Sequence, residues 1–358
     1  MKYRFLIYIS YSYAFPIGEP LELEILRRGY DVKWFADVAE TKAKFSEEKQ
    51  VLNNIKDAID YHPHIVLSIT NSIADFLPGL KVQIFHGFPT SKRNTKKGHF
   101  RIRGFFDLYC THGPSTTKPF LELKKEHQYF EVRETGWPKL DTLFPIWDEP
   151  RNKPCILVAS TFTKRLSLAY NDDLLKEISR LSKLGKWEFK IVLHPKLAQE
   201  RIEKFKEIQN SNLTYYETTN LIPLFREADI LLADSTSVIT EFLLQEKPVI
   251  TFRNSKPGPQ FINFTEVEDL EASLSEGLDP QTKLLENIQD FNKDVHPYKD
   301  GLSSKRIIDA CLEFLYADKK DLKPKPLNLI RKFQERKKLG YYPLKTYRRP
   351  PTLHNEDE

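Results

Sequence analysis

Residues 228–241 read ADILLADSTSVITE, and this one segment already indicates an α/β protein. An apolar run at 230–233 passes directly into Asp-Ser-Thr-Ser at 234–237, and an apolar, helix-like stretch follows. The first N–H groups of a helix have no intrahelical acceptor and carry a partial positive charge, so a helix start can bind phosphate. An ordinary N-cap explains Asp234 but not three successive hydroxyl residues. We therefore predict that Ser235, Thr236 and Ser237 bind phosphate and that Glu241 reaches a sugar hydroxyl.

The same alternation of strand and helix recurs along the whole chain. Strand-like apolar runs lie at 4–9, 31–35, 64–69, 82–85, 108–111 and 130–134, and again at 155–159, 189–193, 213–217, 230–233 and 248–252. Helix-like stretches lie at 20–28, 47–61, 172–184, 198–209, 238–245 and 303–316. Such alternation favours βαβ units and parallel sheets covered on both faces. We predict two Rossmann-like domains, at 1–146 and 147–318, joined by a proline-containing linker.

Two histidines stand where predicted strands end. His86 follows the strand at 82–85, and His194 follows the strand at 189–193. Ligands of open α/β sheets bind beyond the carboxyl ends of the strands, so we expect the site in a cleft between the two domains. Imidazole can accept a proton near neutral pH. Six basic residues and no acidic one lie from 92 to 103, starting with Lys92 and Arg93, which suits a phosphate-bearing ligand. Either histidine could instead simply cap a strand.

The charge of the chain is unevenly distributed. The 358 residues include 55 Lys and Arg against 50 Asp and Glu, a formal charge of +5. Twelve basic and two acidic residues lie between 319 and 349, so this segment carries +10 and the remainder −5. We predict a basic tail at 319–358 that either crosses back to the N-terminal domain or faces a membrane. A solvated helix at 327–339 is the simpler alternative.

Several classes of protein and site are disfavoured. The three cysteines are far apart in sequence and form no CxxC pair, which argues against a disulfide scaffold and for a reducing compartment. There is no Walker A, GxGxxG, DxD or HExxH pattern, so we expect neither a metal nor a cofactor. The apolar start at 5–9 is too short for a signal peptide, and no stretch reaches the ~20 apolar residues of a membrane span. We expect a cytoplasmic protein that touches the inner face of a bacterial membrane from its surface.

Six segments together resemble the CDP-glycerol glycerophosphotransferase family, which includes the teichoic acid primases and polymerases. The segment HGFP at 86–89 resembles the family's HGTP, and GWPKLD at 136–141 resembles GYPRxD. ASTF at 159–162 with Arg165 is similar to APTFR, and LHP at 193–195 matches the HP site. DSTS at 234–237 with Glu241 and KPVI at 247–250 is similar to the DYSS…KPII block, and DGLSSKRI at 300–307 is similar to DGKASxRI.

This resemblance implies a GT-B fold and transfer of glycerol or ribitol phosphate from a CDP carrier to a hydroxyl of a glycan or lipid-linked acceptor. It implies that His86 is the general base and that His194 holds the donor diphosphate. Ser235, Thr236 and Ser237 would bind phosphate, and Glu241 the ribose. The remaining expected donor-site residues are Asp234, Lys92, Arg93 and Arg165.

Two other functions remain open at this point. One is a GT-B glycosyltransferase that uses a CMP- or UDP-sugar in capsule or lipopolysaccharide synthesis, since related enzymes share similar C-terminal segments. The other is a non-catalytic nucleic-acid-binding protein, because aromatic residues alternate with charge in the tail. Nucleic-acid binding explains none of the strand-end residues, so we expect no nucleic-acid partner.

Overall fold

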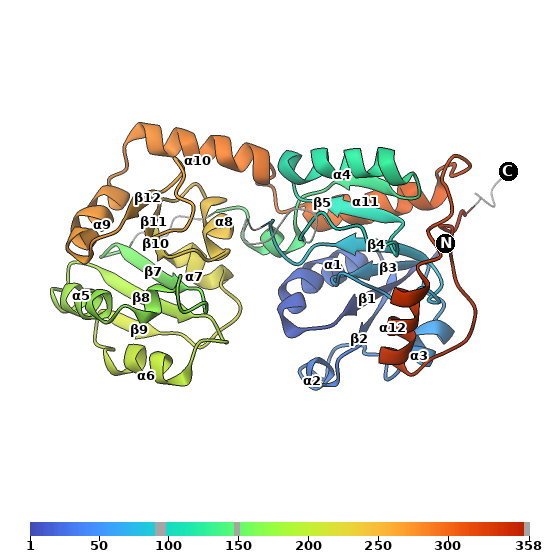
Figure 1. Ribbon diagram of the computed structural model, residues 1–358, viewed down its shortest axis with the longest axis horizontal. Coiled ribbons are helices and arrows are strands. Elements are labelled where there is room, and N and C mark those ends of the chain that lie inside the picture. Colours follow the sequence, from blue (N-terminus) through green and yellow to red (C-terminus); the bar gives the residue numbers. More distant parts are fainter. Residues whose placement is uncertain (90–97, 147–150, 354–358) are drawn as a thin grey trace. The chain divides into compact units, whose positions relative to one another are not determined.

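The computed structural model describes residues 1–89, 98–146 and 151–353 of the chain. It divides into two compact units: Met1–Phe144 with Val295–Glu358 is the first unit, and Pro145–Asp294 is the second unit. Each unit contains one six-stranded sheet, and all neighbouring strands within each sheet run parallel (Figure 1). The predicted α/β class with two Rossmann-like sheets is thereby confirmed.

The sheet of the first unit has the strand order β2-β1-β3-β4-β5-β6. Its strands are β1 (Arg4–Ile9), β2 (Asp31–Ala36), β3 (Ile65–Ser68), β4 (Leu80–Ile84), β5 (Leu108–Thr111) and β6 (Glu131–Glu134). Its helices are α1 (Phe15–Arg27), α2 (Ala39–Lys42), α3 (Ile55–Asp60), α4 (Pro114–His127), α11 (Ser303–Tyr316) and α12 (Leu329–Leu339). Because the chain steps from β1 to β2 on one side and then to β3 on the other, the order reverses between β1 and β3.

One predicted helix of the first unit is much shorter than expected. The helix-like stretch 47–61 forms only the six residues of α3, and Val51 instead pairs with Trp34 as an isolated bridge beside β2. The side chain of Asn54 accepts a hydrogen bond from the Asp57 amide at 3.0 Å, and the Asp57 carboxylate bonds back to the Asn54 amide at 3.3 Å. This capping box fixes the helix start at residue 55, so the predicted start at 47 is wrong.

The sheet of the second unit has the strand order β12-β11-β10-β7-β8-β9. Its strands are β7 (Cys155–Ser160), β8 (Glu188–Leu193), β9 (Leu213–Tyr215), β10 (Ile230–Ala233), β11 (Val249–Phe252) and β12 (Ile262–Phe264). Its helices are α5 (Asp172–Lys183), α6 (Gln199–Glu207), α7 (Ile222–Glu227), α8 (Val238–Leu243), α9 (Leu270–Leu278) and α10 (Thr282–Val295). The order reverses between β7 and β10, the first and fourth strands of this unit.

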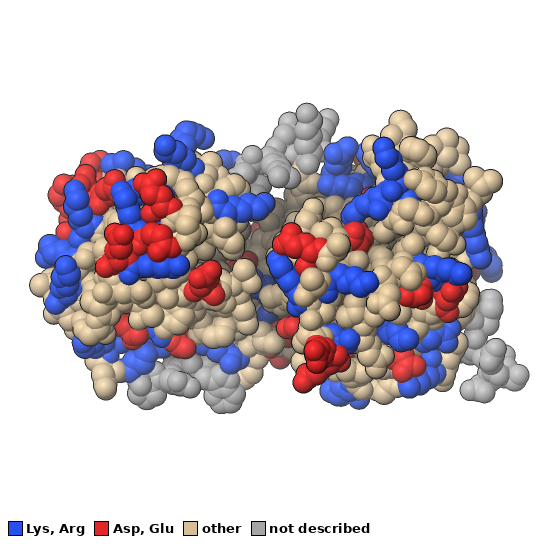
Figure 2. Space-filling model, turned by 90° about the horizontal axis from the view of Figure 1, so that it is seen from below, with Lys and Arg blue, Asp and Glu red and all other residues tan. Residues whose placement is uncertain are grey.

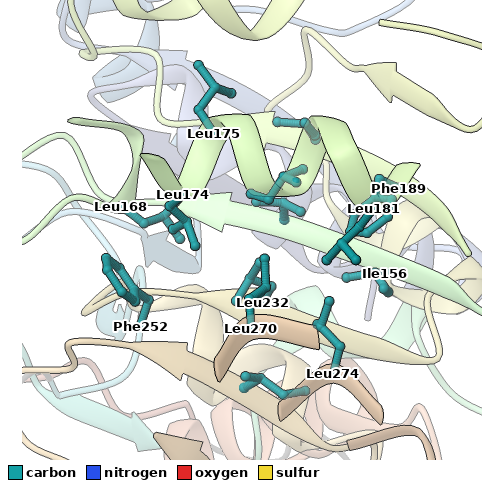
Figure 3. Close-up of a cluster of buried hydrophobic side chains, with 14 of the residues drawn as sticks. Ile156, Leu168, Leu174, Leu175, Leu181, Phe189, Leu232, Phe252, Leu270 and Leu274 are labelled. Atoms are coloured by element: carbon teal, nitrogen blue, oxygen red, sulfur yellow. The ribbon is translucent and has the colours of Figure 1, made fainter. Parts of the chain in front are cut away.

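The core of the second unit shows why its strands are apolar at consecutive sequence positions. Ile156 on β7 and Leu232 on β10 point to one face and meet Leu174 of α5 and Leu274 of α9 (Figure 3). The intervening residues of the same strands are also fully buried, under the helices of the opposite face. A parallel sheet covered on both faces therefore gives continuous apolar runs rather than alternation.

The boundary between the units differs from the one expected at residue 318. Residues from Val295 onward belong to the first unit, so α11 lies there and not in the C-terminal domain. The Asp141 carboxylate accepts hydrogen bonds from the amides of Ser303 and Ser304, at 2.8 and 2.7 Å, and so caps α11. Helix α11 also packs on α1. The predicted site between the two units stays a prediction.

The described part of the basic tail, residues 319–353, folds onto the first unit. Lys325 forms an ion pair of 2.5 Å with Asp107, and both side chains are buried. Arg336 on α12 pairs with the buried Asp75, and the Lys325 amide donates to the carbonyl of Arg348 at 2.8 Å. Several of the tail's cations are thus neutralised by carboxylates of the body. On the face shown in Figure 2, basic and acidic side chains are interspersed over both units.

Candidate functional site

A cavity of about 140 Å³ opens at the carboxyl edge of the second unit's sheet. It lies beside the reversal of strand order between β7 and β10, where open α/β sheets bind ligands. Its walls come from the ends of β7 and β8 and from the loops after β9 and β10. The lining residues are Ala159, Ser160, Val192, Leu193, His194, Pro195, Thr218, Thr219, Leu221, Thr236, Ser237 and Val238. The structure thus brings together three of the predicted site residues: His194, Thr236 and Ser237.

The ring of His194 is oriented by its own loop. Its Nδ1 accepts a hydrogen bond from the Lys196 amide at 3.0 Å. An accepting Nδ1 carries no proton, so the proton of the neutral ring lies on Nε2. The Phe162 ring packs on the imidazole with centroids 4.5 Å apart. His194 therefore lines the cavity with a ring fixed by its own loop, and a donor role for its Nε2 stays a prediction.

Asp234 has a different place from the one expected of a donor-binding residue. It is fully buried, and its carboxylate accepts hydrogen bonds from the Ser160 hydroxyl at 2.7 Å and from the amides of Thr161 and Leu168 at 3.0 Å each. Burial raises the pKa of this carboxyl, and the hydrogen bonds act in the opposite direction. Asp234 ties the end of β10 to the loop after β7, and it does not line the cavity.

The other predicted residues of the second unit are only partly at the cavity. The Ser235 hydroxyl accepts from the Ser255 amide at 2.9 Å and so joins two loops. Glu241 is buried on α8 and Arg165 is exposed, and neither lines the cavity. Helix α8 has six residues, which is shorter than the predicted 238–245. Ser160 also lines the cavity, although the sequence analysis assigned it no role.

The loop after β9 supplies wall residues that the sequence analysis missed. Thr218 and Thr219 line the cavity together with Leu221. Two threonines followed by an asparagine after a predicted strand are a weak pattern, common in ordinary turns. Only the adjacency of β9 to β8 in the sheet brings this loop beside His194.

In the first unit, His86 stands at the carboxyl edge of the sheet, two residues beyond β4. Its ring is exposed and lies 5.4 Å from the ring of Tyr13, which follows β1. The Trp137 indole N–H donates to the Phe85 carbonyl at 2.8 Å, which holds the chain immediately before His86. His86 is therefore positioned by a buried aromatic scaffold, while its own side chain faces solvent.

Phe88, which replaces the family's threonine, belongs to that scaffold. It is buried, with ring centroids 4.7 Å from His112 and 5.1 Å from Trp137. Phe88 therefore has a packing role in the structure. His112 and His296 are buried here too, and burial lowers both pKa values, that of His296 to about 4. His112 also follows a strand, so the strand-end pattern alone cannot distinguish it from His86.

Two of the matching segments have structural roles that connect them. Gly136 adopts a φ of +82°, and a Cβ there would lie 2.5 Å from the Ser303 hydroxyl. Asp141 caps α11, and Asp300 forms an ion pair of 2.8 Å with Arg306. The segments GWPKLD at 136–141 and DGLSSKRI at 300–307 therefore contact each other, and they attach the chain after Val295 to the rest of the first unit.

Some predictions fall outside what the structure describes. Lys92 and Arg93 lie among residues 90–97, which are outside the described residues. Within the described ranges, no group of three or more metal-ligating side chains is found. No helix in the described part of the chain is both long and apolar enough to cross a membrane.

Comparison with solved structures shows the fold class. The wall teichoic acid polymerase TagF is 14% identical, covers 87% of this chain and 89% of its own, and has a TM-score of 0.64. The UDP-GlcNAc 2-epimerase from Neisseria meningitidis bound to UDP-GlcNAc is 15% identical, covers 87% of this chain and 100% of its own, and has a TM-score of 0.60. The S. aureus MnaA–UDP structure is 15% identical, covers 88% and 97%, and has a TM-score of 0.59. These similarities confirm the GT-B fold.

Comparison of the sequence itself shows the family. A search of curated proteins gave no match. The family model described as CDP-Glycerol:Poly(glycerophosphate) glycerophosphotransferase matches residues 90–313, more than half of the 358 residues. The match contains His194 and the 234–241 segment, and it begins four residues after His86. The chain belongs to the CDP-glycerol:poly(glycerophosphate) glycerophosphotransferase family.

Proposed function

We propose that this chain transfers glycerol phosphate, or another polyol phosphate, from a CDP-linked donor to a hydroxyl of a glycan or lipid-linked acceptor. The observation that carries the proposal is the family match over 90–313, which contains every residue that lines the cavity of the second unit. TagF, which is named as a wall teichoic acid polymerase, has the same fold. A role in the synthesis of such a cell-surface polymer agrees with both findings.

The cavity has the chemistry that a diphosphate needs. Five of its lining residues carry hydroxyl groups, and none is acidic: the hydroxyls belong to Ser160, Thr218, Thr219, Thr236 and Ser237. Hydroxyl groups and an imidazole N–H are donors for phosphate oxygens, and a wall without carboxylates does not repel an anion. We assign His194 Nε2 and the hydroxyls of Thr236 and Ser237 to the donor diphosphate.

The proposed reaction is a single displacement at phosphorus. The acceptor oxygen attacks the phosphorus that carries the polyol, and its proton passes to His86. The bond from that phosphorus to the bridging oxygen breaks, and CMP leaves with the bridging oxygen. His194 and the nearby hydroxyls stabilise the charge on the leaving phosphate. Electrostatic stabilisation of this kind usually supplies the largest part of catalysis in phosphoryl transfer.

A panel of donors tests the proposal directly. The purified chain is incubated with CDP-glycerol, CDP-ribitol, CMP-sugars and UDP-sugars and with a glycan or lipid-linked acceptor, and release of CMP or UDP is measured. Calorimetry then compares the binding of the same donors. CMP release from CDP-glycerol or CDP-ribitol with tight binding of that donor is expected. Exclusive binding of a CMP- or UDP-sugar would instead support the glycosyltransferase alternative and overturn the proposal.

Replacing His86 tests the assignment of the base. His86→Ala should lower turnover roughly 100-fold or more while donor binding is unchanged, because the lost group acts on the acceptor proton. His127→Ala on α4 of the same unit is the matched control and should leave turnover unchanged. Near-normal turnover of His86→Ala would remove His86 from this role.

A further inference from the structure

Helix α12 of the first unit presents three apolar side chains to solvent. Leu329, Ile330 and Phe333 are 68%, 78% and 59% exposed, although their spacing places them on one face of the helix. We call these three residues the α12 patch. Leu327 just before the helix and Leu344 just after it are also exposed, at 57% and 96%.

Another face of α12, beside the patch, is held against the protein by charge. Lys332 is buried, with its amine 2.9 Å from the Thr346 hydroxyl and 3.7 Å from the Asp75 carboxylate. Arg336, one turn further along, forms an ion pair with the same buried carboxylate and donates to the Pro343 carbonyl. Leu339 packs against the core of the first unit, but the three residues of the α12 patch point away from it, whereas the apolar stripe of an ordinary surface helix faces the core.

The side chains around the α12 patch carry positive charge. Lys337 lies one turn beyond Phe333 and is exposed, and Lys323 and Lys345 are exposed in the flanking segments. Residues 319–349 carry a formal charge of +10, and the ion pairs with Asp75 and Asp107 neutralise only part of it. Aliphatic and aromatic side chains beside exposed lysines on one helix are typical of segments that lie in the interface of an anionic bilayer.

We propose that the α12 patch docks the first unit on a bilayer that contains anionic lipids. Leu329, Ile330 and Phe333 enter the boundary between headgroups and acyl chains, and the flanking lysines contact lipid phosphates. The charged face with Lys332 and Arg336 keeps the helix on the protein through Asp75. Because the patch is already exposed, docking requires no unfolding of α12.

An ion pair near the end of α12 connects this helix to the sheet edge that carries His86. Lys338 forms an ion pair of 2.6 Å with Asp37, which directly follows β2. In the sheet, β2 and β4 are three strand spacings apart, which is about 14 Å. Docking would hold this edge near a lipid surface, where a lipid-linked acceptor would be found. That consequence depends on the proposed function, whereas docking itself does not.

Vesicle sedimentation tests the docking without any activity measurement. The full chain is spun with vesicles of phosphatidylcholine alone and with vesicles that also contain phosphatidylglycerol. Binding to the anionic vesicles that weakens with salt is expected. Ile330→Asp with Phe333→Asp should weaken this binding tenfold or more, because two apolar side chains no longer leave water.

The matched control places the same change on another helix. Leu23 and Leu26 on α1 are 65% and 53% exposed and have the same three-residue spacing as Ile330 and Phe333. Leu23→Asp with Leu26→Asp should therefore bind vesicles like the unchanged chain. Circular dichroism of both double variants checks that the fold is retained. No binding of the unchanged chain, or equal binding of all three proteins, overturns the proposal.

A label at the patch gives a second, local readout. The three native cysteines are all buried, so Ile330→Cys can be labelled with an environment-sensitive dye. The dye at this position should brighten on anionic vesicles, whereas the same dye at Leu23→Cys should not. If the patch instead joins two copies of the chain, light scattering will show a dimer that Ile330→Asp dissociates, and the dye will not respond to vesicles. That result would also overturn the proposal.

Discussion

Replacing Asp234 by alanine tests whether this buried carboxylate supports the donor cavity as well as the stability of the second unit. The Asp234 carboxylate accepts the amides of Thr161 and Leu168, both at 3.0 Å, and is itself fully buried. Each amide left without an acceptor costs about 1–3 kcal/mol. We expect Asp234→Ala to lower the free energy of unfolding by about 2–6 kcal/mol and to weaken donor binding, because the loop from 160 to 168 loses its attachment to β10.

Asp229 offers a matched control at the opposite edge of the same two strands. Its carboxylate accepts the Cys155 amide at 2.7 Å, at the beginning of β7, as Asp234 does at the end. Asp229→Ala leaves this amide unpaired, which costs about 1–3 kcal/mol, and it also breaks a partly exposed ion pair of 2.9 Å with Arg151, but it should not change donor binding.

Three measurements check the prediction for Asp234. Urea unfolding gives the stabilities, calorimetry gives the donor affinity, and hydrogen exchange follows the amides of Thr161 and Leu168. Exchange at these amides should be faster in Asp234→Ala and unchanged in Asp229→Ala. If both variants lose stability but bind the donor equally well, the proposed link between Asp234 and the donor site is wrong.

Two further predictions concern two buried lysines of the first unit. Lys325→Ala leaves the Asp107 carboxylate buried without its ion-pair partner and should lower the free energy of unfolding by about 3–5 kcal/mol. Lys323→Ala, at an exposed position, should change it little in the same urea titration. Burial, with Lys325 nearby, lowers the pKa of Lys81 from 10.5 to about 7. Between these values the unfolded chain binds more protons, so stability should rise with pH by up to about 1.4 kcal/mol per unit. Lys81→Met should remove most of that slope; an unchanged slope would contradict the buried, deprotonated amine.

The sequence was sufficient for the sheets because their inner strands are buried on both faces. All eleven predicted strands are present, and only the short β12 (Ile262–Phe264) was missed. Helix ends were less predictable, because individual contacts set them. Val51 pairs with Trp34 beside β2, so no helix begins at residue 47. The return of residues 295–316 to the first unit was also missed. It depends on Asp141, 160 or so residues away in sequence, which no local pattern reveals.

The strand-end histidines show what decides a residue's role when the pattern is the same. His86, His112 and His194 all follow parallel strands, yet His112 is buried among aromatic rings and burial lowers its pKa. A neutral, enclosed imidazole cannot contact a substrate, whereas His86 is exposed and His194 lines a cavity. Phe88 and Trp137 are among the rings that pack on His112, and Trp137 also holds the backbone beside His86. His112 therefore belongs to the buried framework that positions His86. Strand position predicts where function can occur, and the packing of distant residues decides which of the candidates remains accessible.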